Sequence, residues 1–379
     1  MLIGAALVFG LTFRSLRIRE GWSASKPQLY VTAVALLWTL VTTATSTNRL
    51  LSLWSAVYVT ACALFFVGSC VAVRDQTWTA LYVMLAPAIA NAIALALQQF
   101  RLWDFYRLDE PSTRSALLGN SNDVGAFILA PAVVASALCV VTPVRRMLHL
   151  VIAAVLVAAI LASGSITATV SYAVAILFTS AQKSWKRTLA TAVAVALISM
   201  AAVTLNRSLR ERVALMRTTI EKRDYNALSS YRLTAFAAAV QMFAKHPLTG
   251  VGPGCYAWHY FDEKIAAEAH HQKLREAGDR LHNYREAHSD YLQILAVSGL
   301  PGFAILAGSL FFLGSISFRN READHMDLQA VFSRTASLSL AAGIAVLMTA
   351  GFPLELSAPT ISILYSVALC FAWRPHDGA

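Results

Sequence analysis

Long apolar runs separated by short polar turns occupy most of the chain. A helix needs about 20 residues to cross a hydrocarbon layer of roughly 30 Å, and only helices satisfy the backbone over such runs in lipid. The stretch 147–181 is interrupted at "ASGSIT" and predicts two shorter spans. The other predicted spans are 29–47, 50–73, 77–99, 123–142, 188–205, about 290–318, 331–350 and 354–372. The pattern predicts an all-α fold, a polytopic transmembrane helical bundle of about 10–12 spans.

Residues 1–13 are apolar but short, and Arg14, Arg17 and Arg19 follow them. A secretory signal would carry a small-residue cleavage site at this point, and none follows. We therefore interpret this segment as the end of a helix, and we expect part of the first span to be missing from the sequence.

The composition agrees with an integral membrane protein, since 57% of the residues are hydrophobic and only 14% are charged. The formal net charge is +10, but the basic residues flank apolar runs and do not form one basic domain. This distribution argues against nucleic acid as a partner. Four of the five cysteines lie in apolar runs and Cys255 stands alone in a polar stretch, so we predict no disulfide framework.

The basic residues also predict the orientation, because Lys and Arg concentrate in the cytoplasmic turns of membrane proteins. They cluster at 14–26, 145–146, 183–187 and 319–321. If all of these basic turns face the cytoplasm, the number of spans between them places the long polar stretch 206–287 on the opposite side of the membrane. The chain then divides into N-terminal transmembrane helices (1–205), an extracytoplasmic loop (206–287) and C-terminal transmembrane helices (288–379).

Amphipathic helices are predicted within this loop. In "SSYRLTAFAAAVQMFAKHP" an apolar stripe has helical spacing, and His246-Pro247 ends it. The stripe consists of Leu233, Phe236, Ala237, Val240 and Phe243. The turn "LTGVGPG" follows, in which Gly250 and Gly252 are candidates for close approach of the backbone to a substrate. It does not fit a phosphate-binding P-loop. Residues 255–287 are predicted to be helix plus loop.

The predicted spans carry almost no ionisable residue, and Glu355 lies in the short turn "GFPLELSAP". Pumps and ion-coupled carriers usually bury such groups within their spans. The serines and threonines of "SGSITATVS" are more typical of helix packing than of a translocation path. An active site is therefore expected at the outer membrane surface. A transporter of lipid-linked glycans, or a non-catalytic binding protein, is the alternative of another class.

Arg232 is the first candidate residue at that surface. With Ser229 or Ser230 as the N-cap, Arg232 falls in the first turn of its helix. A cation is unfavourable there unless it serves an anion, because the dipole is positive at that end. Backbone N–H groups and a guanidinium together suit a phosphate or diphosphate. The alternative is that Arg232 pairs with Glu221 or Asp224, or extends to the membrane interface.

His288 is the second candidate, because it stands where the polar loop passes into an apolar run. Tyr291 follows it at helical spacing. A near-neutral pKa suits a general base, and the nearby Arg280 and Arg285 would lower the pKa and keep the ring neutral. The alternative is a polar anchor at the interface.

Zinc ligation is a further alternative for this stretch, since His270, His271 and His282 precede His288. Their spacing matches no standard ligand set, and no cysteine or carboxylate partner is positioned. We therefore predict no metal site.

Two motifs resemble the O-antigen ligase and O-antigen polymerase superfamily of bacterial envelopes. They are "FAKHPLTGVGPG" and "AHSDYLQILAVSGLPG", preceded by an arginine-bearing helix, and "GNSNDVGAF" resembles the family's Asn-rich entry to a membrane helix. The resemblance covers roughly residues 110–320. It implies a glycosyltransferase of the bacterial inner membrane that acts at the periplasmic face, without cofactor, nucleotide sugar or obligatory metal.

The implied partners are an undecaprenyl-diphosphate-linked glycan donor, a lipid A-core or glycan acceptor, and membrane lipid. By position in the motifs, Arg232 matches the arginine that contacts the diphosphate, and His288 matches the histidine that activates the acceptor. Ligase and polymerase share these residues and differ in their acceptor, so both remain open.

One departure from the family pattern concerns an arginine at the outer end of a mid-chain span, where this chain has Ile166 in "SGSITATV". Arg114, or one of Arg207, Arg210 and Arg212, would have to supply this charge. The predicted substrate-binding residues are accordingly Arg114, Arg210, Gly250, Gly252, Arg285 and Tyr291, beside the catalytic pair His288 and Arg232.

Overall fold

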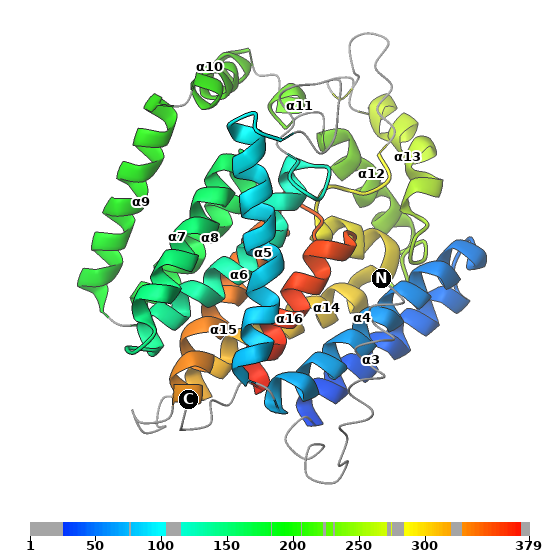
Figure 1. Cartoon of the computed structure of the whole chain (residues 1–379). Coiled ribbons are helices and arrows are strands. Elements are labelled where there is room, and N and C mark those ends of the chain that lie inside the picture. Colours follow the sequence, from blue (N-terminus) through cyan, green and yellow to red (C-terminus); the bar gives the residue numbers. More distant parts are fainter. Residues whose placement is uncertain are drawn as a thin grey trace.

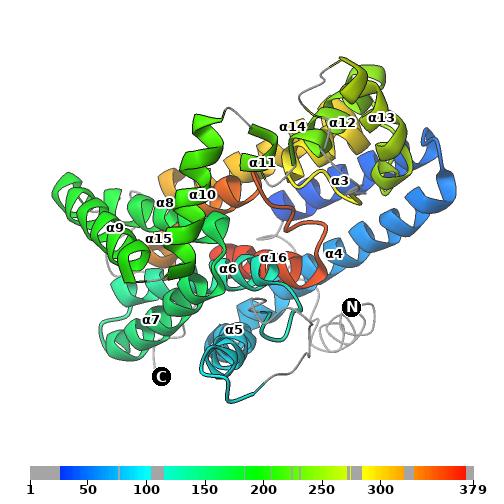
Figure 2. The ribbon, with the colours of Figure 1, turned by 90° about the horizontal axis from the view of Figure 1, so that it is seen from above.

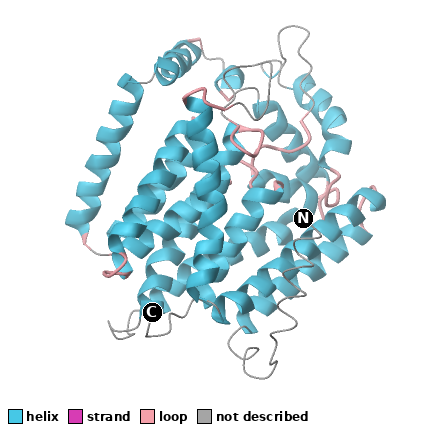
Figure 3. Cartoon of the chain, in the orientation of Figure 1, coloured by secondary structure: helices cyan, strands magenta, loops and turns pink. Residues whose placement is uncertain are grey.

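The computed structural model describes residues 26–75, 77–103, 115–182, 184–205, 207–222, 225–229, 232–270, 274, 284–319 and 328–372. The regular elements in these residues are helices (Figure 3). In chain order they are α3 (Lys26–Ala44), α4 (Arg49–Asp75), α5 (Thr77–Gln99), α6 (Ser121–Val141), α7 (Arg146–Ser163), α8 (Ile166–Ala181), α9 (Trp185–Leu205), α10 (Arg207–Glu221), α11 (Tyr225–Leu228), α12 (Arg232–Lys245), α13 (Tyr256–His270), α14 (Asp290–Arg319), α15 (Leu328–Leu347) and α16 (Ser357–Ala372). The predicted all-α fold is confirmed.

The apolar runs of the sequence coincide with helices α3 to α9 and α14 to α16. Seven of these helices (α3, α4, α5, α6, α7, α14 and α15) are long and apolar enough to cross a membrane, and α8 and α16 are apolar but shorter. The chain is therefore a multi-pass membrane protein. The segment interpreted as the end of a first span, 1–13, lies outside the described residues.

The predicted interruption of the 147–181 run is the junction of α7 and α8. Gly164 ends α7 in the left-handed conformation at φ 74°, which glycine adopts without steric cost. Ser165 then caps α8, and its side chain accepts a hydrogen bond from Ala168 N. Because one residue ends a helix and the next begins another, the run folds into two short helices as predicted.

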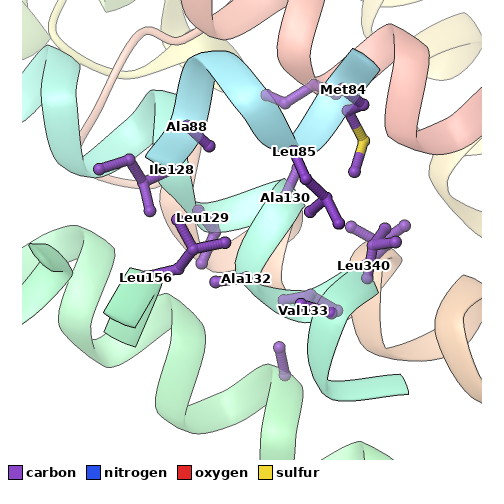
Figure 4. Close-up of a cluster of buried hydrophobic side chains, with 14 of the residues drawn as sticks. Met84, Leu85, Ala88, Ile128, Leu129, Ala130, Ala132, Val133, Leu156 and Leu340 are labelled. Atoms are coloured by element: carbon purple, nitrogen blue, oxygen red, sulfur yellow. The ribbon is translucent and has the colours of Figure 1, made fainter. Parts of the chain in front are cut away.

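Helix α6 lies at the centre of the bundle and packs against α7, α8, α15 and α16. Many of its buried residues are small, and small residues let helices in lipid approach closely. A Cβ at Gly125 would lie 2.8 Å from Ser165 and Ala168 on α8. Around α6, larger side chains such as Leu85, Leu156 and Leu340 fill the core (Figure 4).

Helices α10 to α13 gather at one end of the bundle, at the top of Figure 1. Viewed from above, α12 and α13 lie over α14, whereas α9 forms the opposite edge of the molecule (Figure 2). Helix α9 contacts α8 and α10. These four helices fall within the predicted loop 206–287, and they form a cap on one end of the bundle.

Helix α12 is amphipathic, but its buried face differs from the predicted stripe. The buried residues are Thr234, Ala235, Ala238, Ala239 and Met242. The predicted stripe is only partly buried, and its Val240 is 51% exposed. The physical reason is that small residues allow close packing of α12 on α13 and α14, which leaves the bulkier residues of the predicted stripe only partly buried.

Helix α14 is broken at Gly299, where φ is 66° and ψ is −170°. A Cβ there would lie 2.2 Å from the carbonyl oxygen of Leu248. Leu300 N donates to Pro247 O at 2.9 Å. The kink therefore allows the segment after α12 to dock against α14, in a backbone conformation that only glycine adopts readily.

Candidate functional site

The turn between α15 and α16, residues 348–356 (hereafter the α15–α16 turn), is bound to the start of α14. Asp290 N donates to Met348 O and to Gly351 O, at 3.1 Å each. Leu354 N in turn donates to the Asp290 carboxylate at 3.2 Å. Because Asp290 is buried, its carboxylate and N–H together fix the turn to the first residue of α14.

Arg232 opens α12 and contacts the same turn. Its guanidinium Nη1 donates to Ala350 O at 2.9 Å. Ser229 Oγ accepts from Leu233 N at 3.2 Å and so satisfies one backbone N–H group in the first turn of α12. Burial lowers the pKa of Arg232, although the group remains a cation at any ordinary pH. A partly buried guanidinium therefore stands at the positive end of the α12 dipole, as the sequence predicted.

One of the alternative partners predicted for Arg232 is engaged elsewhere. Glu221 pairs with Arg217 at 3.0 Å on the exposed side of α10. Asp224 lies outside the described residues.

His288 stands two residues before α14 in the left-handed region, at φ 55°. A non-glycine residue rarely adopts this conformation, which is enriched at functional sites. Two aromatic rings meet its imidazole edge to face, Tyr284 at 4.8 Å and Phe352 at 4.7 Å between centroids. Its Nδ1 is buried and has no hydrogen-bond partner among the described residues. The two aromatic contacts thus fix the ring by packing.

Burial, and then the positive charge of Arg232, lower the pKa of His288 to about 4. The predicted neutral state of the ring is therefore the one favoured near pH 7. The expected cause was different, because Arg285 is exposed and the charge that acts on His288 is Arg232. Arg280 lies outside the described residues. Proximity in the sequence suggested the wrong cation, because the docking of α12 brings Arg232 close to His288.

Glu355 lies near the end of the α15–α16 turn. It forms a side-chain hydrogen bond with Gln293, whose side-chain oxygen also accepts from Ala287 N at 2.8 Å. Glu355 retains solvent-accessible surface, although protein atoms surround it closely. The loss of hydration raises the pKa of Glu355 to about 7, and the negative charge of Glu286 adds to the effect.

Glu286 extends this acidic side toward α6. Burial raises its pKa, with Asp123 in the first turn of α6 acting in the same direction and Arg285 opposing it. The "GNSNDVGAF" segment, whose Asn120 caps α6, therefore comes near the segment that carries His288. The site has a cationic side at Arg232 and an acidic side at Glu355 and Glu286.

A row of aromatic rings connects α13 with His288. Tyr256 stacks on Tyr260 at 5.9 Å between centroids, and Tyr260 meets Tyr284 edge to face at 5.8 Å. Tyr284 is the ring that contacts His288. Tyr256 is also anchored by its hydroxyl, which donates to Ala235 O at 2.8 Å. The cap formed by α12 and α13 therefore positions the imidazole.

The glycine turn packs against α14. Gly250 N donates to His246 O at 2.9 Å, and Gly252 N donates to Val297 O at 3.1 Å. A Cβ at Gly250 would lie 2.3 Å from the Val297 backbone, and one at Gly252 would lie 2.1 Å from Ser46 Oγ. Close helix packing accounts for both glycines, and their role in substrate binding stays a prediction.

The other predicted substrate-binding residues are not brought to Arg232 and His288 by any contact in the described part of the chain. The Tyr291 hydroxyl donates to Ala345 O of α15 at 2.9 Å. Arg210 is exposed and donates to Thr204 O, at the end of α9, at 3.0 Å. Arg114 lies outside the described residues, as do two members of the alternative zinc set, His271 and His282.

An apolar cavity of about 400 Å³ lies between α3, α4, α14, α15 and α16. Trp38, Tyr58, Ile294 and Leu306 are among its lining residues. Met348 and Leu354 of the α15–α16 turn also line it, so the cavity reaches the turn that holds Arg232 and His288. Its volume is within the range of binding sites for small molecules and lipid chains.

The inner part of the cavity is bordered by phenylalanines. Phe371 stacks on Phe312 at 5.7 Å and meets Phe66 edge to face at 6.3 Å. These three rings contribute to the lining, which is apolar over most of its length.

The O-antigen ligase family model matches residues 148–307. This stretch of the chain resembles the O-antigen ligase family. The match runs from α7 into α14 and includes Arg232 and His288, and it confirms the predicted resemblance to this family. A search of curated proteins found no match. The domain supports a glycan-transfer function in the membrane of the O-antigen ligase type, with a lipid-linked glycan donor and a glycan acceptor in general.

The α15–α16 turn lies beyond the matched residues, and sequence reasoning did not assign it to the site. The one sequence feature that pointed to this turn was Glu355, an ionisable residue beside predicted spans. Phe352 and Tyr284 gave no signal, because nothing in their local sequence indicates that they contact His288.

Proposed function

We propose that this protein transfers a glycan from an undecaprenyl-diphosphate carrier to an acceptor hydroxyl, as an O-antigen ligase-like glycosyltransferase. The acceptor in this proposal is a sugar of lipid A-core. The observation that carries the proposal is that Arg232 and His288, both within the residues matched by the O-antigen ligase family model, meet on one turn beside an apolar cavity.

Arg232 binds the diphosphate of the donor. A guanidinium forms two parallel hydrogen bonds with phosphate oxygens, and the α12 dipole adds a favourable field at the same place. As the bond between the sugar and the diphosphate breaks, negative charge grows on the leaving oxygen. Stabilisation of developing charge by fixed groups is usually the largest single contribution to catalysis.

His288 takes the proton of the attacking hydroxyl. In the empty site the imidazole is neutral but weakly basic, because burial and Arg232 lower its pKa. A bound diphosphate compensates the charge of Arg232, so donor binding raises the basicity of His288. The hydroxyl oxygen then bonds to the anomeric carbon as the diphosphate leaves, and this direct displacement inverts the anomeric centre.

The apolar cavity is the proposed place for the first part of the prenyl chain. Hydrocarbon is more stable against apolar side chains than in water, and the cavity leads from the membrane-spanning helices to the α15–α16 turn. The donor can then keep its lipid among the helices while its diphosphate lies at Arg232.

In this proposal the protein lies in the bacterial inner membrane with the site facing the periplasm. Polymerisation of O-antigen or exopolysaccharide repeats would use the same residues with a second glycan as acceptor. A transporter of lipid-linked glycans would use the same cavity without forming a bond.

The test uses protein in proteoliposomes with an undecaprenyl-diphosphate oligosaccharide. Lipid A-core and a second lipid-linked oligosaccharide are offered as acceptors in separate reactions. We expect transfer to lipid A-core, its loss in Arg232→Ala, and normal transfer in Arg217→Ala, which removes an exposed arginine paired with Glu221. Transfer to the second oligosaccharide alone would indicate a polymerase. Absence of any new glycosidic bond would refute the proposal.

A further inference from the structure

We propose that Glu355 binds a hydroxyl group of the acceptor sugar and so forms the acceptor side of the site. This inference rests on the proposed function, because it assumes that Arg232 holds the leaving diphosphate. It assigns a substrate class to a side of the site that the family match does not cover, since the α15–α16 turn lies outside residues 148–307.

The first argument is the separation of charge across the α15–α16 turn. Arg232 binds Ala350 O and is the charge that acts on His288. Glu355 is held by Gln293, and the charge that acts on it is the carboxylate of Glu286. A diphosphate is attracted to the first side and repelled by the second.

The second argument is the direction of attack. In a direct displacement the nucleophile approaches the anomeric carbon from the side opposite to the leaving group. If the diphosphate lies at Arg232, the acceptor therefore approaches from the side of the turn away from Arg232. Phe352 contacts His288, and Glu355 N donates to Phe352 O at 3.1 Å. Glu355 therefore lies on the same turn as Phe352, the ring that contacts His288.

The third argument is the free capacity of the carboxylate. A carboxylate offers about four acceptor positions, and Gln293 uses one of them. Asp290 differs, because its buried carboxylate caps Leu354 N and holds the turn. Glu355 is exposed, so its remaining oxygen positions can accept hydrogen bonds from sugar hydroxyls.

The charges around Glu355 define which sugars fit. The turn itself carries no other charged residue. Asp290 of α14 and Glu286 of the preceding segment face it, and Arg285 acts on Glu286. Tyr58 and Cys62 of α4, which also line the apolar cavity, are the uncharged titratable groups that face it. With these carboxylates on one side, a neutral or amino sugar is favoured at this subsite over a sugar that carries a phosphate.

The test measures the acceptor KM between pH 6 and pH 8 in the wild type and in Glu355→Gln, with undecaprenyl-diphosphate oligosaccharide as donor and lipid A-core as acceptor. The pKa of Glu355 is raised to about 7, so the charged form is lost as the pH falls through this range. We expect the wild-type acceptor KM to rise toward pH 6. In Glu355→Gln we expect an acceptor KM about 10-fold higher and independent of pH, with kcat nearly unchanged.

Two further variants separate binding from a general structural effect. Glu286→Gln removes the charge that raises the pKa of Glu355, so the rise in acceptor KM should move to lower pH. Asp262→Asn removes an exposed carboxylate of α13 at the same end of the protein and should behave as the wild type. Unchanged acceptor KM in Glu355→Gln would overturn the inference, and so would a loss of kcat with the acceptor KM unchanged.

A binding measurement distinguishes failure of this inference from failure of the proposed function. Calorimetric titration with the delipidated core oligosaccharide needs no turnover. The inference predicts binding that is tighter at pH 8 than at pH 6 in the wild type, with no such difference in Glu355→Gln. Absence of binding, or equal pH dependence in both proteins, would refute it even if glycan transfer occurs.

Discussion

Replacement of Arg232 by glutamine should raise the pKa of His288. The pKa is about 4, against an ordinary value of 6.5, and burial is the larger cause of the difference. His288 stays buried in Arg232→Gln, so removal of the charge reverses less than half of the decrease in its pKa. We expect an increase of about 1 pH unit or less, which corresponds to about 1.4 kcal/mol between the two protonation states. Glutamine keeps an N–H donor for Ala350 O, so the change is mainly one of charge.

Nuclear magnetic resonance of protein with isotope-labelled histidine, in detergent or nanodiscs, measures this pKa directly. The His288→Gln variant identifies the signal by its loss. Arg285→Gln is the matched control, because Arg285 is closer in sequence but exposed. A titration midpoint that stays at about 4 in Arg232→Gln, or that moves equally in Arg285→Gln, would show that Arg232 does not act on His288.

Four further results are expected. Arg232→Ala should abolish glycan transfer while Arg232→Lys recovers part of it, because an ammonium cannot form the paired hydrogen bonds of a guanidinium; full activity in Arg232→Ala would refute the diphosphate contact. His288→Gln should lower kcat by about 10²–10⁴ with little effect on donor binding, and a near-normal rate would reduce His288 to an orienting group. Gly299→Ala should lower the thermal unfolding midpoint, since the backbone conformation at this position is unfavourable by roughly 1–3 kcal/mol in a non-glycine residue. Gly308→Ala is the control and should leave the midpoint unchanged, because nothing lies within 4 Å of the added Cβ. Equal midpoints in the two variants would argue against the kink. A cysteine at the exposed Ala269, in a cysteine-free background, should react with a membrane-impermeant thiol reagent in intact spheroplasts, and reaction only after lysis would reverse the proposed orientation.

The helices could be predicted from the sequence because lipid imposes strict requirements on composition and length. Apolar runs predicted α3 to α9 and α14 to α16, and Gly164 and Ser165 predicted the break between α7 and α8. The buried face of α12 could not be predicted in the same way. The spacing of apolar residues indicates an amphipathic helix but not which residues pack closely, and α12 packs through small residues and exposes Val240.

The candidate site was only partly predictable. Arg232 and His288 were identified because each stands at the start of a helix with a recognisable motif. The contact that connects them to each other is made through Ala350 and Phe352, more than 60 residues further along the chain. Such contacts depend on how α15 and α16 pack, and no local pattern reports them. For the same reason the sequence assigned the low pKa of His288 to Arg285, its near neighbour.

Transfer of a glycan by the purified protein tests the central claim most directly. Protein in proteoliposomes receives an undecaprenyl-diphosphate oligosaccharide and lipid A-core, with and without a chelator, and the linkage in the product is determined by nuclear magnetic resonance. We predict a new glycosidic bond of inverted anomeric configuration, formed equally well with the chelator. Movement of the donor across the membrane without any new bond, or retention of the anomeric configuration, would contradict the account.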